Sequence, residues 1–361
     1  MSDDSGKGIE DKARGATPDL VGPYLAKVLD EERWRQPKVE LVSGGRSNLT
    51  YVVTAEDGAE VILRRPPLGH VLPTAHDMTR EFTVISALRD TDVPVPEAIH
   101  LCTDEDVIGA PFYVMERLRG HILRSAWPPG YADTPERKRA IGDALVDTLA
   151  KIHAVDWAAV GLEEFGHPEG FMARQLRRWT QQWERSTTRE LPMMDELIAK
   201  LEEKLPTSPD PTIVHGDFRI DNTILDPDQP GRILGVLDWE MSTLGDPLAD
   251  LGLTLVYWPN EGDVDEYKKA FGQITVTEAD GFLSREDVVA RYADATGRDV
   301  SDVTWYWSFG FFKLAVILEG IHARFLQGKT VGEGFETIGD RVPPLVLVGT
   351  YVLDRGEVGS I

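Results

Sequence analysis

A short stretch of the chain carries residues whose types and spacing suit phosphoryl transfer. The sequence contains Val214-His215-Gly216-Asp217-Phe218-Arg219-Ile220-Asp221-Asn222, followed by Leu237-Asp238-Trp239. Asn222 stands five residues after Asp217, and Asp238 sixteen residues after Asn222, each beside an apolar, strand-like stretch. Transfer of a phosphoryl group from ATP needs one carboxylate to accept a hydroxyl proton, and an Asn and an Asp to hold Mg²⁺ against the phosphates. The spacing therefore predicts Asp217 as the catalytic residue and Asn222 and Asp238 as metal ligands.

Each half of this pattern has a plainer explanation when it is taken alone. His-Gly-Asp can be an ordinary loop, and Asp-Trp can be the end of a strand. The two halves in this order and spacing favour the chemical interpretation. His215 is expected to support the loop by hydrogen bonding and not to bind metal, and Asp221 to stand behind the site or to be exposed.

Composition limits the classes of protein that this chain can represent. The 361 residues include 42% hydrophobic and 27% charged residues, typical of an ordinary globular protein with a substantial core. A formal charge of −23 argues against nucleic acid or an anionic membrane surface as partners, and it suits a cationic substrate. Cys102 is the only cysteine, which excludes an intrachain disulfide and fits a reducing compartment. With no apolar leader and no stretch long enough to span a bilayer, a cytoplasmic location is expected.

Strand patterns fill the first third of the chain and helical patterns the rest. A lead-in helix is expected over residues 18–36, and a helix over 75–88 that precedes the breaker Pro94-Val95-Pro96. Alternating apolar residues separated by turn residues predict strands over 39–42, 49–53, 60–64 and 111–116. From about Pro135 the spacing of apolar residues predicts helices over 135–154, 168–186, 193–204, 285–296 and 302–327.

This order of elements predicts an α+β fold with two lobes. Residues 1–17 are expected to form a disordered tail, because they are polar and lack an apolar core. Residues 18–118 would form a small N-lobe built on an antiparallel sheet, and residues 119–361 a larger, mostly helical C-lobe. The motif of residues 214–239 falls in the C-lobe as short strands and loops.

On these residues the chain resembles the aminoglycoside phosphotransferase and choline kinase superfamily, small-molecule relatives of the protein kinases. The resemblance covers roughly residues 35 to 330 and implies a protein-kinase-like fold. The subgroup associated with acyl-CoA dehydrogenases is the most similar, through Leu63-Arg64-Arg65-Pro66-Pro67, Arg80-Glu81-Phe82 and Arg174-Gln175-Leu176-Arg177-Arg178-Trp179. A further block, Gly245-Asp246-Pro247 with Asp250-Leu251, implies that Asp246 and Asp250 anchor the catalytic loop through hydrogen bonds.

The resemblance also implies a nucleotide site in the first lobe. The turn formed by Ser43, Gly44, Gly45, Arg46, Ser47 and Asn48 would cover the ATP phosphates, because glycine lets backbone N–H groups approach them closely. A simple Gly-Gly hairpin turn explains the same residues. Arg64 would bind phosphate at the position where protein kinases use Lys, because a guanidinium can bind phosphate through two hydrogen bonds. Glu81 would direct the Arg64 side chain. The alternative is that Arg64 is a solvated charge at the end of a strand. Met115, Glu116 and Leu118 look like the hinge between the lobes, where backbone groups would read the adenine.

Two helical segments bear on the phosphoryl acceptor. Trp305–Leu314 falls where relatives line the acceptor pocket, although an aromatic-rich helix is equally explained as core. Arg174, Arg177 and Arg178 give a basic face to an otherwise acidic chain, either as a solvated surface or as an anchor for an anionic substrate such as a CoA phosphate.

The sequence therefore predicts an ATP- and Mg²⁺-dependent kinase acting on a hydroxyl of a small molecule. Resemblance to the acyl-CoA dehydrogenase subgroup implies a hydroxyacyl-CoA, while the net acidity favours an aminoglycoside or another amino alcohol. A catalytically silent, nucleotide-binding module is the alternative of another class, which the filled positions 217, 222 and 238 argue against. Neither the acceptor nor the oligomeric state follows from the sequence.

Overall fold

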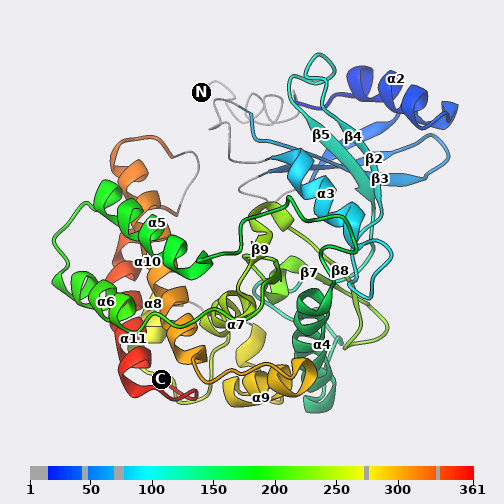
Figure 1. The fold of residues 1–361 in the computed structure, drawn as a ribbon. Coiled ribbons are helices and arrows are strands. Elements are labelled where there is room, and N and C mark those ends of the chain that lie inside the picture. The colour runs from blue at the N-terminus through cyan, green and yellow to red at the C-terminus, as the bar shows by residue number, and fades with distance from the viewer. Residues whose placement is uncertain (1–14, 43–47, 69–76, 272–275, 331–333) are drawn as a thin grey trace, which may run out of the picture. The chain divides into compact units, whose positions relative to one another are not determined.

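The computed structural model describes residues 15–42, 48–68, 77–271, 276–330 and 334–361 (Figure 1). The predicted phosphate-covering turn lies outside these residues, except for Asn48, and so does most of the predicted tail. The chain divides into two compact units. Unit 1 runs to Arg119 and includes Leu234–Glu240, and unit 2 contains Gly120–Ile233 and Met241–Ile361. The short segment that carries Asp238 thus belongs to unit 1.

A five-stranded antiparallel sheet forms unit 1. Its spatial order is β1-β2-β3-β5-β4. The strands are β1 (Lys38–Leu41), β2 (Leu49–Thr54), β3 (Glu60–Arg65), β4 (Ala98–Cys102) and β5 (Phe112–Glu116). Because side chains alternate along a strand, neighbouring residues of β3 serve opposite faces of the sheet.

Two arginines at the end of β3 illustrate this alternation. Arg64 pairs in register with Thr50 of β2 and Tyr113 of β5. Arg65, on the other face, is buried and donates to the carbonyl oxygens of Gly15 (2.5 Å) and Ile108 (2.8 Å). The two side chains therefore have separate roles, as the pattern predicts.

Three short helical elements accompany the sheet in the described residues up to Arg119. They are α2 (Pro18–Val28), η1 (Glu32–Trp34) and α3 (Met78–Leu88). The expected lead-in helix ends earlier than predicted, and Asp30, two residues beyond α2, adopts a left-handed φ of 54° that a helix cannot continue. The carboxylate of Asp77 accepts the backbone N–H groups of Thr79 and Arg80, which caps α3 and places Glu81 in its first turn.

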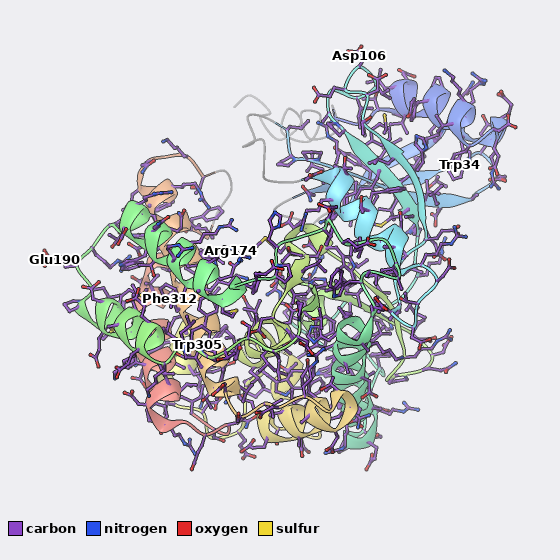
Figure 2. All side chains as sticks on the ribbon, in the orientation of Figure 1. Trp34, Asp106, Arg174, Glu190, Trp305 and Phe312 are labelled. Atoms are coloured by element: carbon purple, nitrogen blue, oxygen red, sulfur yellow. The ribbon has the colours of Figure 1, made fainter. Side chains whose placement is uncertain are left out.

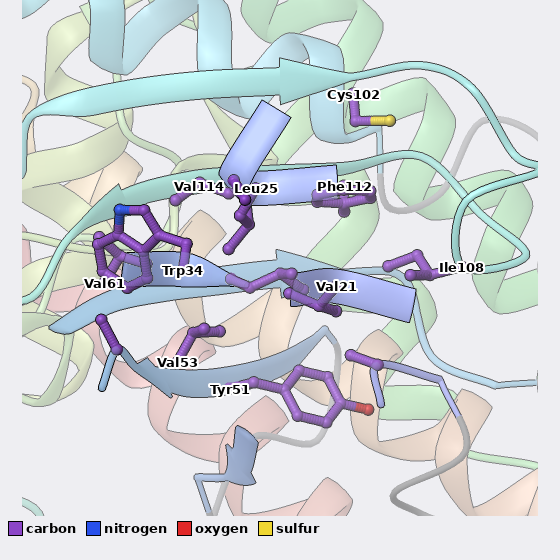
Figure 3. Packing of buried hydrophobic residues seen from close by; sticks show 14 residues of the cluster. Val21, Leu25, Trp34, Tyr51, Val53, Val61, Cys102, Ile108, Phe112 and Val114 are labelled. Carbon is purple, nitrogen blue, oxygen red and sulfur yellow. The ribbon is translucent and has the colours of Figure 1, made fainter. Parts of the chain in front are cut away.

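The core of unit 1 lies between α2, η1 and one face of the sheet (Figure 3). The apolar side chains of Leu25, Trp34, Val53 and Phe112 are fully or almost fully buried there. Cys102 joins the same cluster as a buried free thiol. Packing of this cluster leaves the opposite face of the sheet, which carries Arg64, for α3.

Helices build most of unit 2. They are α4 (Pro135–Ala154), α5 (Phe171–Ser186), α6 (Pro192–Glu203), α7 (Pro247–Val256), α8 (Asp265–Phe271), α9 (Arg285–Thr296), α10 (Val303–Leu326) and α11 (Val342–Arg355). Short 3₁₀ turns occur at Ile220–Asn222, Trp239–Met241, Val276–Glu278 and Ile338–Arg341. Strands β6 (Thr212–Val214) and β9 (Thr243–Gly245) pair antiparallel, and β7 (Thr223–Leu225) follows the predicted catalytic motif. Strand β8 (Ile233–Val236) and the turn at Trp239–Met241 lie mostly in the segment Leu234–Glu240 of unit 1.

Helix α10 is the centre of unit 2. It packs against α5, α7 and α11, and most of its side chains are buried, including Trp305 and Phe312 (Figure 2). The core interpretation of the aromatic segment is therefore correct for these residues. Lys313 is the charged exception within residues 305–314.

The sequence-based fold prediction is confirmed for its strongly periodic parts. A small antiparallel sheet precedes a helical region, and the predicted helices agree with α4, α5, α6, α9 and α10 within a few residues. Strand β4 and helices α7, α8 and α11 were not predicted. Helix α7 is buried on nearly all sides and so lacks the one-sided apolar pattern that reveals a helix. Among the described residues, no helix is both long enough and apolar enough to cross a membrane.

Candidate active site

The loop of unit 2 that the sequence predicts to be catalytic, residues 215–222, begins where β6 ends. Backbone N–H groups of His215 and Gly216 donate to the carboxylate of Asp250, at 2.5 and 2.7 Å. Asp250 lies in the first turn of α7, which Asp246 caps by accepting the N–H of Leu248 at 3.0 Å. The anchoring role predicted for Asp250 is thus seen directly, whereas Asp246 holds the helix that carries it.

Gly216 gives the loop its turn. Its φ of +83° is left-handed, and a Cβ added there would lie 2.7 Å from the carbonyl oxygen of Met241. Any other residue would meet both backbone strain and a clash. The next residue, Asp217, is consequently held in a fixed direction.

Asp217 and Asn222 meet at the ends of this loop. The Asn222 Nδ2 donates to the backbone oxygen of Asp217 at 2.8 Å and to its Oδ2 at 3.0 Å. The Asp217 N–H donates to Nδ1 of the fully buried His215 at 3.2 Å, which is the supporting role expected of that histidine. The Asp217 side chain stays 32% exposed, so its carboxylate is both oriented and accessible.

Buried polar groups extend the anchor of the loop. His153 Nε2 lies 3.3 Å from the carboxylate of Asp250, and its Nδ1 lies 2.7 Å from the hydroxyl of Tyr292. Burial by itself would raise the pKa of Asp250. The hydrogen bond from His153, with the Gly216 N–H, nevertheless holds that pKa below its usual value. The anchor therefore remains an ionised acceptor.

Arg219 is a site residue that the sequence interpretation missed. Its Nη2 lies 3.0 Å from Oδ2 of Asp221, its Nε lies 3.5 Å from Oδ2 of Asp217, and its guanidinium carbon stands 4.8 Å from the ring centre of Tyr257. Burial raises the pKa of Asp221, and Arg219 opposes that rise. The alternation Asp-Phe-Arg-Ile-Asp could have revealed it, since an arginine two residues from each acid can reach both.

A small cavity of about 50 Å³ opens beside these residues. Aromatic and aliphatic side chains form most of its wall, with Arg124, Arg219 and Asp221 as the charged groups. The other lining residues are Leu145, Phe218, Ile220, Thr254, Tyr257, Trp258 and Thr277. The cavity is mostly apolar with few charges, and it is several-fold smaller than the usual pocket for an organic ligand.

Arg64 is the centre of the candidate nucleotide site in unit 1. Its Nε donates to Oε2 of Glu81 at 3.0 Å and its Nη2 to Oδ1 of Asp238 at 2.5 Å. Glu81 is fully buried, and Arg64 is only 13% exposed. Burial opposes the charge of Arg64, but the two carboxylates outweigh it and raise the pKa of the guanidinium. The predicted pair of Arg64 and Glu81 is present, and Asp238 joins it.

Asp238 has an unusual backbone. It follows β8 with a left-handed φ of 66°, which Asp tolerates better than most residues. The next residue, Trp239, is fully buried, and its indole N–H donates to the carbonyl of Val236 at 3.0 Å. The Asp238 side chain remains 31% exposed. A strained turn held by a buried tryptophan thus presents a carboxylate to solvent.

The remaining predicted nucleotide residues also fall in unit 1. Asn48 is buried and donates through Nδ2 to Glu240 at 3.1 Å. Met115 is buried near the end of β5, and the backbone N–H of Glu116 donates to the carbonyl of Glu97 at 2.9 Å. Leu118 packs tightly against Gly235, where an added Cβ would lie 2.3 Å from it. Ser43, Gly44, Gly45, Arg46 and Ser47 lie outside the described residues.

The two predicted metal ligands, Asn222 of unit 2 and Asp238 of unit 1, each keep a side-chain oxygen of the kind that binds Mg²⁺. Within the described ranges, no group of three or more His, Cys, Asp or Glu residues could hold a metal ion by itself. Asn222 uses Nδ2 for both of its hydrogen bonds, so Oδ1 remains as an oxygen donor, and Asp238 keeps Oδ2. Mg²⁺ typically takes only one or two protein oxygens and completes its shell with phosphate oxygens and water.

Comparison with known proteins places the chain among the kinase-like phosphotransferases. The model of the phosphotransferase enzyme family matches residues 38–283, and the chain belongs to that family. Acyl-CoA dehydrogenase family member 10 of mouse is 36% identical over 321 residues, covering 88% of this chain and 29% of the mouse protein. Member 11 of rat is 36% identical over 322 residues, covering 86% of this chain and 39% of the rat protein. The predicted superfamily and subgroup are therefore confirmed, and the chain spans less than half the length of these relatives.

Solved structures support the same fold. A protein from Ralstonia eutropha, whose name proposes an aminoglycoside phosphotransferase, is 34% identical with a TM-score of 0.76, covering 88% of this chain and 93% of that one. A choline/ethanolamine kinase family protein from Mesorhizobium loti shares the fold at 16% identity, with a TM-score of 0.62 and coverage of 96% and 98%. The two-lobed α+β fold predicted from the sequence is thus the fold of this chain.

Proposed function

We propose that this protein is an ATP- and Mg²⁺-dependent kinase that phosphorylates a hydroxyl group of a small molecule. The observation that carries the proposal is the pairing of Asp217 with Asn222 at 3.0 Å on a loop that buried Asp250 anchors. This arrangement orients an accessible carboxylate and leaves the amide oxygen of Asn222 for a metal ion. Family membership supports the same reaction class.

The residues of unit 2 would act on the acceptor. The Asp217 carboxylate would accept a hydrogen bond from the hydroxyl group, orient its oxygen and take its proton as transfer proceeds. Arg219, whose Nε lies 3.5 Å from Oδ2 of this carboxylate, would help to fix its direction. Bound MgATP would supply the phosphoryl group and spread the charge that develops on it.

The residues of unit 1 would hold the nucleotide. Arg64, directed by Glu81, has the planar donor array that binds phosphate oxygens in pairs. Asp238 and, in unit 2, Asn222 are the proposed magnesium ligands. The backbone near Met115, Glu116 and Leu118 is the proposed adenine-reading segment, and residues 43–48 the proposed cover of the phosphates.

The proposed acceptor is a hydroxyacyl-CoA or a similar hydroxylated acyl compound. Relatives at 34 to 36% identity carry the name acyl-CoA dehydrogenase family member, which links this family branch to acyl-CoA compounds. An aminoglycoside or another amino alcohol is the second candidate. The name of the Ralstonia protein and the net charge of −23 favour it.

Turnover of MgATP across hydroxyacyl-CoAs, aminoglycosides and choline-like amino alcohols tests the proposal, with Asp217→Asn assayed alongside. Phosphorylation of one acceptor class that the variant loses is the expected result. Mg²⁺-dependent ATP binding without transfer to any acceptor would favour a silent nucleotide-binding module. Absence of nucleotide binding would overturn the proposal.

A further inference from the structure

Lys313 is the single charged residue in the aromatic run Trp305–Leu314 of α10. Its Nζ donates to the carbonyl oxygen of Gly216 at 3.1 Å, next to Asp217 in the catalytic loop. An ammonium group has three N–H donors, so this bond leaves two for other partners. The longest helix of unit 2 thus carries a cation to the loop proposed to do the chemistry.

The surroundings of Lys313 differ from those of Arg64 and Arg285. Arg64 contacts Glu81, and Arg285 contacts Asp263 at 2.6 Å, so each of these two guanidinium groups has a carboxylate partner. Buried Arg65 instead donates to backbone carbonyl oxygens. Among the residues that the structure describes, no carboxylate oxygen lies within 4 Å of the Lys313 Nζ. A largely buried charge without an ion-pair partner is costly unless another group compensates it.

A second cation converges on the same place. Helix α5 packs against α10 and brings Trp179 beneath Lys313, with the Nζ 5.8 Å from the centre of the indole ring. The guanidinium carbon of Arg178 lies 5.7 Å from the same ring centre. Within the described part of the chain, the buried indole N–H of Trp179 has no hydrogen-bond partner. Two positive charges and an unused N–H donor therefore gather around one aromatic ring.

The charged groups that act on Lys313 lie on three elements, the loop, α7 and α5. Burial lowers the pKa of its ammonium group, Asp217 of the loop and Asp250 of α7 raise it, and Arg178 of α5 lowers it again. Repulsion between Lys313 and Arg178 costs free energy in the free protein. A bound anion near both cations would reduce that cost, because it attracts each of them.

Arg174 does not belong to this cluster. Its guanidinium donates to the backbone carbonyls of His167 and Glu169, just before α5 (Figure 2 labels the residue). The basic face predicted over Arg174, Arg177 and Arg178 is therefore divided: Arg174 holds the loop before the helix, and Arg178 turns to Trp179.

We propose that Lys313, Arg178 and Trp179 form an anion-binding subsite that holds a carboxylate or phosphate group of the phosphoryl acceptor near Asp217. The inference rests on the proposed kinase function and adds the residues that select the acceptor. It favours an anionic hydroxylated acceptor over a cationic aminoglycoside or amino alcohol, in spite of the net charge of the chain.

Binding measured by calorimetry, without nucleotide, tests the subsite independently of turnover. The probes are 4-hydroxybutyrate, its uncharged methyl ester and phosphopantetheine, which separate a carboxylate from a phosphate as the recognised group. Lys313→Met should weaken binding of the preferred anion roughly tenfold to a hundredfold, the value of a lost charge-assisted hydrogen bond. Binding of the ester should stay unchanged, and Lys313→Arg should restore much of the affinity for the anion.

Two further variants separate recognition from folding. Arg178→Gln changes an exposed side chain, so it should fold normally and still weaken binding of the anion. Arg185→Gln, an exposed position near the end of the same helix, is the matched control and should bind like the unmodified protein. Equal binding of anion and ester, or unchanged affinity in both Lys313→Met and Arg178→Gln, would overturn the subsite.

The kinetic consequence is specific to the acceptor. Once turnover is established, Lys313→Met should raise the KM for the anionic acceptor far more than the KM for ATP. Anion binding that depends on Lys313 in a protein without kinase activity would leave the subsite standing and reject the proposed function. Turnover that does not depend on the charge of the acceptor would support the proposed function and reject the subsite.

Discussion

The two charged centres of this protein are stabilised in different ways. In unit 1, Arg64 is compensated by side-chain charges, from fully buried Glu81 and from Asp238. In unit 2, Asp217 is positioned mainly through the backbone, because buried Asp250 accepts the N–H groups of His215 and Gly216. A centre that binds a charged ligand needs a directed cation, whereas a centre that moves a proton needs a fixed but accessible carboxylate.

This difference predicts that variants of the two centres affect different quantities. Changes at the Arg64 centre should act on nucleotide affinity, and changes at the catalytic loop on turnover. The change that separates the two centres most strongly is the removal of the proposed base.

Asp217→Asn should lower kcat by about 10²-fold or more and leave the affinity for MgATP nearly unchanged, because the amide cannot take the hydroxyl proton. Steady-state kinetics and a nucleotide titration measure the two quantities. Asp228→Asn, at an exposed position of unit 2, is the control and should be unaffected. Turnover that survives in Asp217→Asn would reject the base assignment.

Asp238→Ala should abolish Mg²⁺-dependent nucleotide binding, because it removes the proposed metal ligand of unit 1. Ala is also strained at a φ of 66°, whereas Asn tolerates that conformation. Asp238→Asn therefore tests the charge without the strain and should bind MgATP at least tenfold more weakly. Nucleotide titrations with and without Mg²⁺ give the answer, and equal affinity in Mg²⁺ would contradict the metal role.

Glu81→Gln should raise the KM for ATP by about tenfold and change kcat less, because Arg64 loses its buried directing charge. Breaking a buried ion pair should also lower the free energy of unfolding by about 3 kcal/mol. Glu97→Gln is the matched control, since Glu97 pairs with Arg89 at 3.0 Å on the exposed surface and such pairs contribute little. A larger fall in kcat than in nucleotide affinity would show that the two centres are not separate.

The smallest effect concerns acid stability. The pKa of Asp250 is lowered in the folded state, so its contribution is present above the unfolded value near 4 and is lost as pH falls through the folded value. The free energy of unfolding, measured with denaturant between pH 6 and pH 3, should therefore fall less steeply with falling pH in Asp250→Asn than in the unmodified protein. Burial raises the pKa of Asp246, so Asp246→Asn should steepen that loss instead. The same dependence of the free energy of unfolding on pH in all three proteins would refute this assignment of the anchor.

Local pattern was sufficient for elements with a clear period. The strands of residues 49–53 and 60–64 and the helix of 135–154 were predicted nearly to the residue, because one of their faces is apolar and the other polar. Helix α7 was missed because it is buried all round, although it carries the Asp250 that anchors the loop. Elements at the centre of a fold lose the polar face that makes them recognisable in a sequence.

The sequence by itself determined the family through several motifs, and the two-lobed fold through the order of its strand and helix patterns. The spacing within one short motif indicated the candidate residues Asp217, Asn222 and Asp238. Contacts between distant segments were decided by the tertiary structure alone. Lys313 reaches Gly216 across 97 positions of the chain, and Arg64 meets Asp238 across 174. No local period encodes such pairs, since they depend on how buried helices and strands pack and on which charges must find partners away from water.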